Sequence, residues 1–216
     1  MSVNILGKEY PIATTTELDL SYKNLTELPE SIGSLSILQE LIISNNNLIS
    51  LPESIGKLSN LEYLYLYNNN LTILPESIGS LSNLKELYLY YNNLISVPES
   101  IGTLSNLQEL WLSNNKLTRL PESIQSLSNL EYLYLHDNKL TSLPKSIQTL
   151  TKIENFVLDE SSYDINNLSM DCHTLILTDI ENNITNLPPS LRKLYLRSDI
   201  NVDMIKLPYG CDIIRF

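Results

Sequence analysis

Aromatic side chains recur at a fixed interval in the middle of this 216-residue chain and are its clearest candidates for chemistry. Tyr65, Tyr88, Trp111 and Tyr134 follow one another at steps of 23 residues. Exposed rings of these types are typical of binding hot spots. Further aromatic residues, one histidine and three acidic residues lie close to them. The complete set of candidate binding residues is Ile42, Tyr63, Tyr65, Tyr67, Glu86, Tyr88, Tyr90, Tyr91, Glu109, Trp111, Tyr132, Tyr134, His136 and Asp137.

Two short pairs, His136-Asp137 and Cys172-His173, contain residue types that serve in catalysis. Adjacent residues of a strand point to opposite faces, so we expect the two side chains of each pair to diverge. Neither pair comes with a placed nucleophile and general base. The two cysteines, Cys172 and Cys211, lack metal-like spacing and are expected to be free, buried thiols. We therefore predict no enzyme activity, no catalytic residue, no metal site and no cofactor.

A tandem repeat must position the aromatic residues. Six prolines lie at a strict step of 23 residues, five of them in the sequence Leu/Val-Pro-Glu-Ser-Ile. They are Pro29, Pro52, Pro75, Pro98, Pro121 and Pro144. A fixed period of this length predicts a solenoid, in which each unit buries its apolar face only by stacking on its neighbours.

Each unit contains one short strand and one return segment. Leu41 and Ile43 alternate with period two, as in a strand, and an Asn-rich turn follows. On the opposite side, Pro52 suits the first helical position and Glu53 suits the positive end of the helix dipole, which predicts a one-turn helix. The residues expected to point inward in this unit are Leu38, Leu41, Ile43, Leu48, Leu51, Ile55 and Leu58.

The unit Leu38-x-x-Leu41-x-Ile43-x-x-Asn46-x-Leu48 resembles the leucine-rich repeat family in its 23-residue form. The match is specific over residues 15 to 150 and weakens toward residue 200. The resemblance implies an α/β solenoid of horseshoe shape, with a parallel concave sheet of about eight or nine strands and a convex face of short α or 3₁₀ turns. One inward asparagine per unit is expected to bond backbone groups of adjacent turns. These structural residues are Asn46, Asn69, Asn92, Asn115 and Asn138.

One solenoid domain accounts for the whole chain. We expect an N-terminal cap, in the form of a hairpin, at residues 1–14 and regular repeats at 15–150. Irregular and shorter repeats follow at 151–200, where the strand leucines come only 19 residues apart. Residues 201–216, including Ile213, Ile214 and Phe216, are expected to close the C-terminal end.

The residue between the two inward leucines of each strand should point to the concave face. That central column is Asp19, Ile42, Tyr65, Tyr88, Trp111, Tyr134, Val157, Ile176 and Tyr195. Strands lie about 4.8 Å apart, so the four aromatic residues would form a ladder about 15 Å long. The repeat does not require rings here, because Ser44 and Ser113 show that a flanking position accepts small polar residues. In the alternative interpretation, tyrosine simply favours strands and stacks across them without any ligand.

Charge and composition restrict the partners. A net charge of -11 argues against binding to nucleic acid and to anionic membranes. Glu86, Glu109 and Asp137 beside the rings favour a partner with a basic surface. The chain has no signal-like N-terminus and no apolar stretch approaching 18 residues, so an intracellular, cytoplasmic protein is expected. Its abundance of Asn, Ile and Tyr resembles that of proteins from AT-rich genomes, such as those of amoebae or giant DNA viruses.

The leading hypothesis is a non-enzymatic protein-protein interaction module that binds its partner on the concave face. Similarity to intracellular Ras-group and Ras-binding scaffold repeats implies a small GTPase as one candidate partner. A carbohydrate or small-ligand receptor on the same face is an alternative, although small ligands favour more enclosed pockets. A self-associating structural protein, such as a homodimer paired through the aromatic faces, is another.

Overall fold

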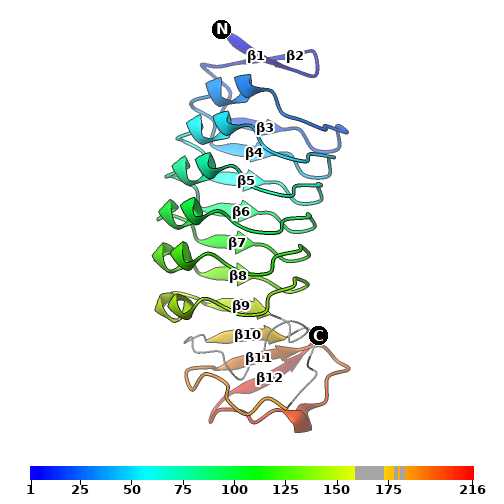
Figure 1. The fold of residues 1–216 in the computed structure, drawn as a ribbon, viewed down its shortest axis with the longest axis vertical. Helices are drawn as coiled ribbons and strands as arrows, with labels where there is room; N and C mark the ends of the chain where they lie inside the picture. The colour runs from blue at the N-terminus through cyan, green and yellow to red at the C-terminus, as the bar shows by residue number, and fades with distance from the viewer. Residues whose placement is uncertain (159–172, 178–179, 181–182) are drawn as a thin grey trace.

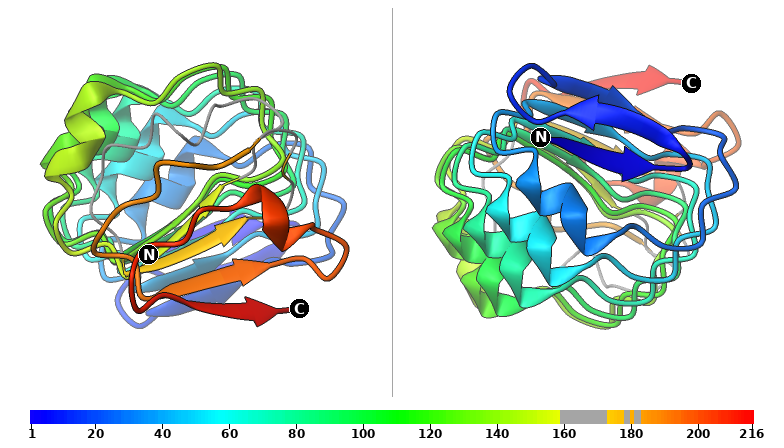
Figure 2. Two further views of the ribbon diagram at one scale, coloured as in Figure 1. Left: turned by 90° about the horizontal axis from the view of Figure 1, so that it is seen from below. Right: turned by 90° about the horizontal axis from the view of Figure 1, so that it is seen from above.

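The chain folds into one elongated stack of repeats in the computed structural model, which describes residues 1–158, 173–177, 180 and 183–216 (Figure 1). Ten strands form one parallel sheet in the order β12-β11-β10-β9-β8-β7-β6-β5-β4-β3. Seen along the solenoid axis, the strands and the helical turns occupy separate sides of a single coil (Figure 2). The strands are β3 (Glu17–Asp19), β4 (Glu40–Ile42), β5 (Tyr63–Tyr65), β6 (Glu86–Tyr88), β7 (Glu109–Trp111), β8 (Tyr132–Tyr134), β9 (Asn155–Leu158), β10 (Thr174–Leu177), β11 (Lys193–Leu196) and β12 (Asp212–Arg215).

The return segments are 3₁₀ helices, each preceded by the repeated proline. They are η1 (Glu30–Ser34), η2 (Glu53–Lys57), η3 (Glu76–Ser80), η4 (Glu99–Thr103), η5 (Glu122–Ser126) and η6 (Lys145–Thr149), and a further one, η8 (Val202–Met204), lies near the C-terminus. Pro52 has a ψ of 150° and its carbonyl accepts the first helical bond, from the Ile55 amide at 3.0 Å. The prediction that proline takes the first helical position is therefore wrong by one residue. Its fixed φ also suits an extended residue, and Glu53 begins the helix.

The core is a continuous set of apolar columns between the strands and the helical turns. Six of the seven residues predicted to point inward in the second repeat are completely buried, and Leu51 is 6% exposed. Each residue of this kind contributes roughly 1.5 to 3 kcal/mol of gross burial. Because the strands pair in register, Leu41 lies directly between Leu18 and Leu64 in the neighbouring repeats. One repeat therefore completes the core of the next.

Buried asparagines tie the repeats together. The Asn92 Oδ1 accepts a hydrogen bond from the Leu71 amide at 3.0 Å, and its Nδ2 donates to the carbonyls of Leu66 and Leu89 at 3.0 Å. Asn46, Asn69, Asn115 and Asn138 make the corresponding bonds. Each amide thus satisfies backbone groups of its own repeat and of the preceding one.

Different elements cover the two ends of the stack. At the N-terminus, β1 (Ser2–Ile5) and β2 (Lys8–Pro11) form an antiparallel hairpin whose Val3 and Ile5 are buried. At the C-terminus, the residues expected to form only a cap instead add a tenth strand, β12, which pairs in parallel with β11. Ile213 continues the inward column of Leu194 there, which explains why the segment extends the sheet. The Arg215 guanidinium donates to the carbonyls of Arg197 and Ile200, at 3.0 and 2.6 Å, and covers the last coil.

The shorter repeats are described in part. β9, β10 and β11 pair in register, with Leu175 between Phe156 and Leu194. Cys211 is a free, partly buried thiol, whereas Cys172 lies outside the described residues. Burial raises the pKa of the Cys211 thiol.

Glycines allow the helical turns to stack closely. A Cβ atom added to Gly56 would lie 2.5 Å from the Ser77 carbonyl oxygen and 2.8 Å from the Ser77 Cβ. Gly33, Gly79 and Gly102 face the next repeat in the same way. The buried Ser77 Oγ has no hydrogen-bond partner in the described part of the chain, so its small size explains its place better than its hydroxyl does.

Replacing Asn92 with Ala should lower the free energy of unfolding by about 2 to 4 kcal/mol, because buried backbone groups lose their partners. Denaturant unfolding followed by circular dichroism measures this change. The exposed Asn70, in the turn of the preceding repeat, is the control, and its replacement with Ala should change stability by less than about 0.5 kcal/mol. Equal effects of the two substitutions would contradict the structural role of the asparagine ladder.

Replacing Gly56 with Ala should destabilise the protein by about 1 to 3 kcal/mol, since the added methyl group collides with the backbone of the next turn. Replacing Ser77 with Ala, by contrast, should leave stability unchanged or raise it, because it removes a buried hydroxyl without a partner. Thermal unfolding of both variants tests this contrast. A tolerated Gly56 substitution would show that the turns do not need to pack this closely.

Candidate binding surface

The register of the sheet places the predicted central residues in one exposed column. Tyr65 pairs with Tyr88, Tyr88 with Trp111, and Trp111 with Tyr134. Ile42 precedes them on β4, and Val157 follows on β9. We call this exposed side of the ten-stranded sheet the concave face. All four aromatic side chains are partly buried, because they cover one another.

Consecutive rings of this column touch. The ring centroids are 4.7 Å apart for Tyr65 and Tyr88, 4.6 Å for Tyr88 and Trp111, and 4.3 Å for Trp111 and Tyr134. The planes are inclined by 29° to 38°. Offset or tilted contacts of this kind contribute about 0.5 to 1.5 kcal/mol each beyond burial. We call these four residues the aromatic ladder.

A second group of rings joins the ladder from the side where the strands end. Tyr67 and Tyr90 stack with centroids 4.7 Å apart and planes only 4° from parallel. Tyr90 also lies 5.7 Å from Trp111, which connects the two groups. Tyr91 meets Tyr90 edge-on at 5.8 Å and is 53% exposed. Seven of the predicted aromatic residues therefore form one connected cluster.

Two carboxylates on the other side of the ladder hold the ring hydroxyls. Tyr65 donates to Glu86 and Tyr88 donates to Glu109, both at 2.7 Å. The Trp111 Nε1 donates to the same Glu109 carboxylate at 3.1 Å. Burial raises the pKa of Tyr65 and Tyr88, and the neighbouring carboxylates raise it further. The hydroxyls consequently stay protonated and keep donating, so each carboxylate stays fixed beside the rings.

The remaining predicted tyrosines lie on the same acidic border of the face. Tyr63 lies 5.9 Å from the Lys85 ammonium, which itself pairs with Glu62 at 2.6 Å. Tyr132 donates to Glu154 at 3.3 Å. Neither tyrosine belongs to the connected ring cluster. They extend the surface along the beginnings of the strands.

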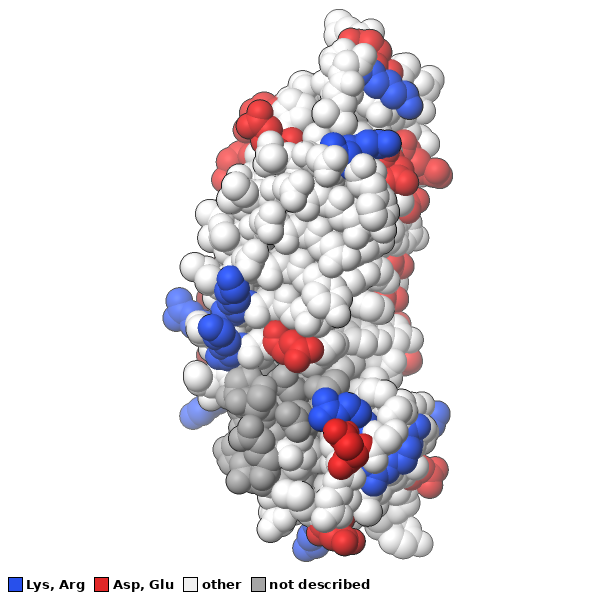
Figure 3. Space-filling view, turned by 90° about the vertical axis from the view of Figure 1, so that its right-hand side faces the viewer, with Lys and Arg blue, Asp and Glu red and all other residues white. Residues whose placement is uncertain are grey.

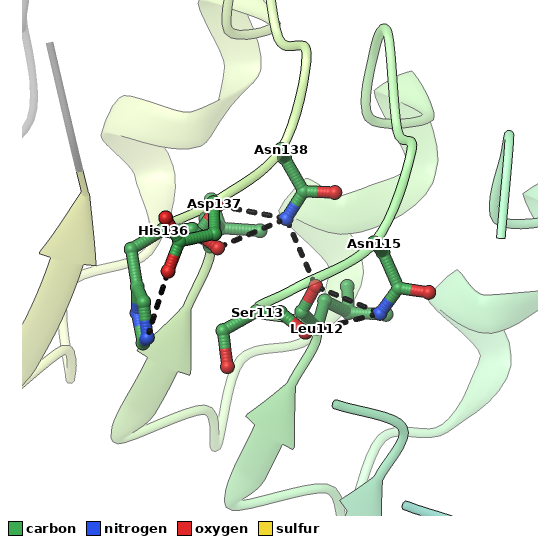
Figure 4. A network of polar contacts seen from close by, with 7 residues as sticks. Leu112, Ser113, Asn115, His136, Asp137 and Asn138 are labelled. Atoms are coloured by element: carbon green, nitrogen blue, oxygen red, sulfur yellow. Dashed lines mark hydrogen bonds and ion pairs between the residues drawn. The ribbon is translucent and has the colours of Figure 1, made fainter. Parts of the chain in front are cut away.

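His136 and Asp137 lie together, contrary to the expectation that their side chains diverge (Figure 4). The His136 Nε2 is 3.9 Å from the Asp137 Oδ2. Asp137 has a φ of 54°, so the chain has left the strand and turns its side chain back toward His136. The same turn carries Asn138, which donates to the carbonyls of Leu112 and Leu135 at 2.9 and 2.8 Å.

Two groups of exposed residues were absent from the predicted set. His173, Arg192 and Lys193 line a hollow of about 490 Å³ beyond the ladder, together with Glu154, Asn155, Thr174 and Tyr195. The 19-residue spacing of the last repeats concealed their alignment with the regular columns. Ile49, Ile73 and Ile95 are exposed by more than half in consecutive repeats, after the turns that end the strands. On the side where the strands end, charged residues are sparse between the N-terminal repeats and the middle of the molecule (Figure 3).

Other kinds of site are missing from the described residues. They contain no group of three or more His, Cys, Asp or Glu side chains suited to a metal ion. They also contain no helix with the length and apolar character needed to cross a membrane.

Solved structures share this architecture. The leucine-rich repeat domain of the type III effector XopL is 30% identical with a TM-score of 0.75, over 93% of this chain and 76% of that one. A leucine-rich repeat protein of Leptospira interrogans is 33% identical with a TM-score of 0.68, and the match covers 92% of this chain but only 58% of that protein. YopM from Yersinia enterocolitica is 28% identical with a TM-score of 0.64, over 94% of this chain and 42% of YopM. No curated protein sequence gave a significant match.

The sequence itself matches a family model, described as a leucine-rich repeat region, at residues 17–93 and 76–174. Together these segments span most of the sheet and its helical turns. The register, the asparagine ladder and the solved structures agree with that match. This chain belongs to the leucine-rich repeat family.

Proposed function

We propose that this protein is a non-enzymatic interaction module that binds a protein partner through the aromatic cluster of its concave face. The observation that carries the proposal is the connected cluster of seven rings on an exposed sheet. Tyr and Trp are the residue types enriched at interface hot spots, and clustering is typical of such sites. The leucine-rich repeat neighbours include effector proteins, whose fold is suited to presenting such a face.

Tyr91 supports a role beyond packing of the sheet. It has a φ of 53°, in the left-handed region that non-glycine residues seldom adopt. Three other repeats have Asn at this turn position, Asn45, Asn68 and Asn114, and Asn tolerates that conformation best. A tyrosine therefore costs stability here while it remains half exposed. The repeat does not need that ring, but a binding surface does.

The border of the cluster favours a partner that presents lysine or arginine. Glu86 and Glu109 are held next to the rings, and Glu40 lies nearby on β4. Burial raises the pKa of Glu40, and the negative charges of Glu17, Glu86 and Asp19 raise it further. Such an excess of negative charge attracts basic groups. A small GTPase, which the resemblance to Ras-group repeats implies, is one candidate to be sought in the capture experiment.

The ring geometry favours a protein over a sugar. Sugar binding needs an exposed ring face, whereas the faces of Tyr88 and Trp111 each pack against two neighbours in the ladder. Ring edges and hydroxyls remain for contact. These suit the backbone and side-chain groups of a protein surface.

A variant with Tyr65, Tyr88, Trp111 and Tyr134 all changed to Ser should lose the partner. Native protein, the ladder variant and a control are used as bait in a lysate of the source organism, and retained proteins are quantified by mass spectrometry. Recovery of the partner should fall by at least tenfold on the ladder variant, because each hot-spot ring contributes about 1 to 4 kcal/mol. Circular dichroism first establishes that every bait is folded.

The control variant changes Glu53, Glu76, Glu99 and Glu122 to Gln, which alters four residues on the helical side of the coil. It should retain the partner at the native level. If all three baits retain the same proteins, or none retains any, the ladder only packs the sheet and the proposed function is wrong. Binding of the purified partner to the native protein and to a single Trp111→Ala variant then measures the contribution of one ring.

A further inference from the structure

The charged residues along the beginnings of the strands change sign from one end of the concave face to the other. From β3 to β9 the carboxylates at or just before the strands outnumber Lys85, which is already paired with Glu62. These carboxylates are Glu17, Glu40, Glu62, Glu86, Glu109, Glu131 and Glu154. At β10 and β11 the same two columns carry His173, Arg192 and Lys193 instead. The sign changes just beyond the aromatic ladder.

The basic end contains a hollow, unlike the acidic border. Arg192 and Lys193 are exposed, and the hollow of about 490 Å³ that they line also offers the polar side chains of Asn155, Thr174 and Tyr195. One Arg192 nitrogen, Nη1, donates to the carbonyls of Pro189 and Leu191 at 3.2 Å. Those bonds orient the guanidinium, and its other nitrogens remain available. Fixed guanidinium groups are well suited to carboxylates.

The opposite wall of the hollow limits where an anion can lie. Glu154 lines that wall, and its carboxylate accepts the Tyr132 hydroxyl. On the far side of the basic group, Asp212 pairs with Lys193 across β11 and β12. An anionic group is therefore confined to the neighbourhood of Arg192 and Lys193, and a basic group is favoured on the Glu154 side.

We propose that the concave face binds an extended segment of its protein partner whose lysine or arginine residues lie on the Glu86–Glu109 border and whose aspartate or glutamate residues lie at Arg192 and Lys193. The inference rests on the proposed function, and it specifies the polarity of the partner. Four strand steps separate Glu109 on β7 from Lys193 on β11, which is about 19 Å at about 4.8 Å a step. An extended chain spans this distance in about six residues.

Trp111, the only tryptophan, lies between the two charged regions and reports binding through its fluorescence. Three peptides of 14 residues, free of Trp and Tyr, are titrated at fixed ionic strength. The bipolar peptide has three Lys and three Glu separated by six residues. In the basic peptide Gln replaces the Glu residues, and in the phosphorylated peptide phosphoserine replaces them.

The bipolar peptide should bind about fivefold more tightly than the basic peptide, an effect expected of two or three partly exposed charge contacts. General attraction to a chain of net charge -11 predicts the opposite order, because the basic peptide carries more positive charge. The preference should disappear in an Arg192→Gln/Lys193→Gln variant. It should persist in a Lys116→Gln/Lys139→Gln variant, which loses the same charge from exposed turns away from this face.

Equal or weaker binding of the bipolar peptide would overturn the inference, as would a preference that survives the Arg192/Lys193 substitutions. Binding of the phosphorylated peptide alone would overturn the assignment of the anion as a carboxylate. A captured partner that is lost from the ladder variant but kept by the Arg192/Lys193 variant would overturn the polarity and leave the proposed function intact. A partner indifferent to the ladder overturns the proposed function itself.

Discussion

The structure depends on one constraint: a single repeat cannot bury its own leucines. Leu41 and its equivalents are fully buried only because a repeat lies on each side. This requirement holds the strands in register, and the register in turn places every residue 23 positions from its equivalent in the adjacent strand. The asparagine ladder and the close glycine contacts both depend on that spacing. A side chain repeated along the sequence therefore becomes a continuous column in space.

The same constraint leaves the exposed columns free to vary. Leu and Asn are required inside, whereas the position that carries Tyr67 and Tyr90 carries Ser44 and Ser113 in other repeats. Columns of exposed residues can thus acquire aromatic or charged groups without disturbing the core. Tyr91 is the exception, because its turn position imposes a positive φ. The surface character of each column is consequently better evidence of function than the fold itself.

Most of the regular part could be predicted because its period is strict. The four ladder residues were identified by counting from the inward leucines. β12 could not be identified in this way, since Ile213 and Ile214 stand in a segment without the repeat's proline or asparagine, and only pairing with β11 makes it a strand. The contact between His136 and Asp137 was also missed, although Asn at the equivalent positions indicates a left-handed turn there. The basic hollow was hidden by the change from a 23-residue to a 19-residue spacing.

Contacts within the aromatic cluster determine how it can bind. The rings are already stacked, and Glu86 and Glu109 already hold the hydroxyls of Tyr65 and Tyr88. A partner therefore meets side chains that have little rotamer freedom left to lose, which lowers the entropic cost of association. Because the ring faces are occupied, a cationic side chain is attracted mainly to the fixed carboxylates, and the ring edges supply apolar contact. The carboxylates and the hollow at Arg192 then determine which segment fits, while the rings provide most of the binding energy.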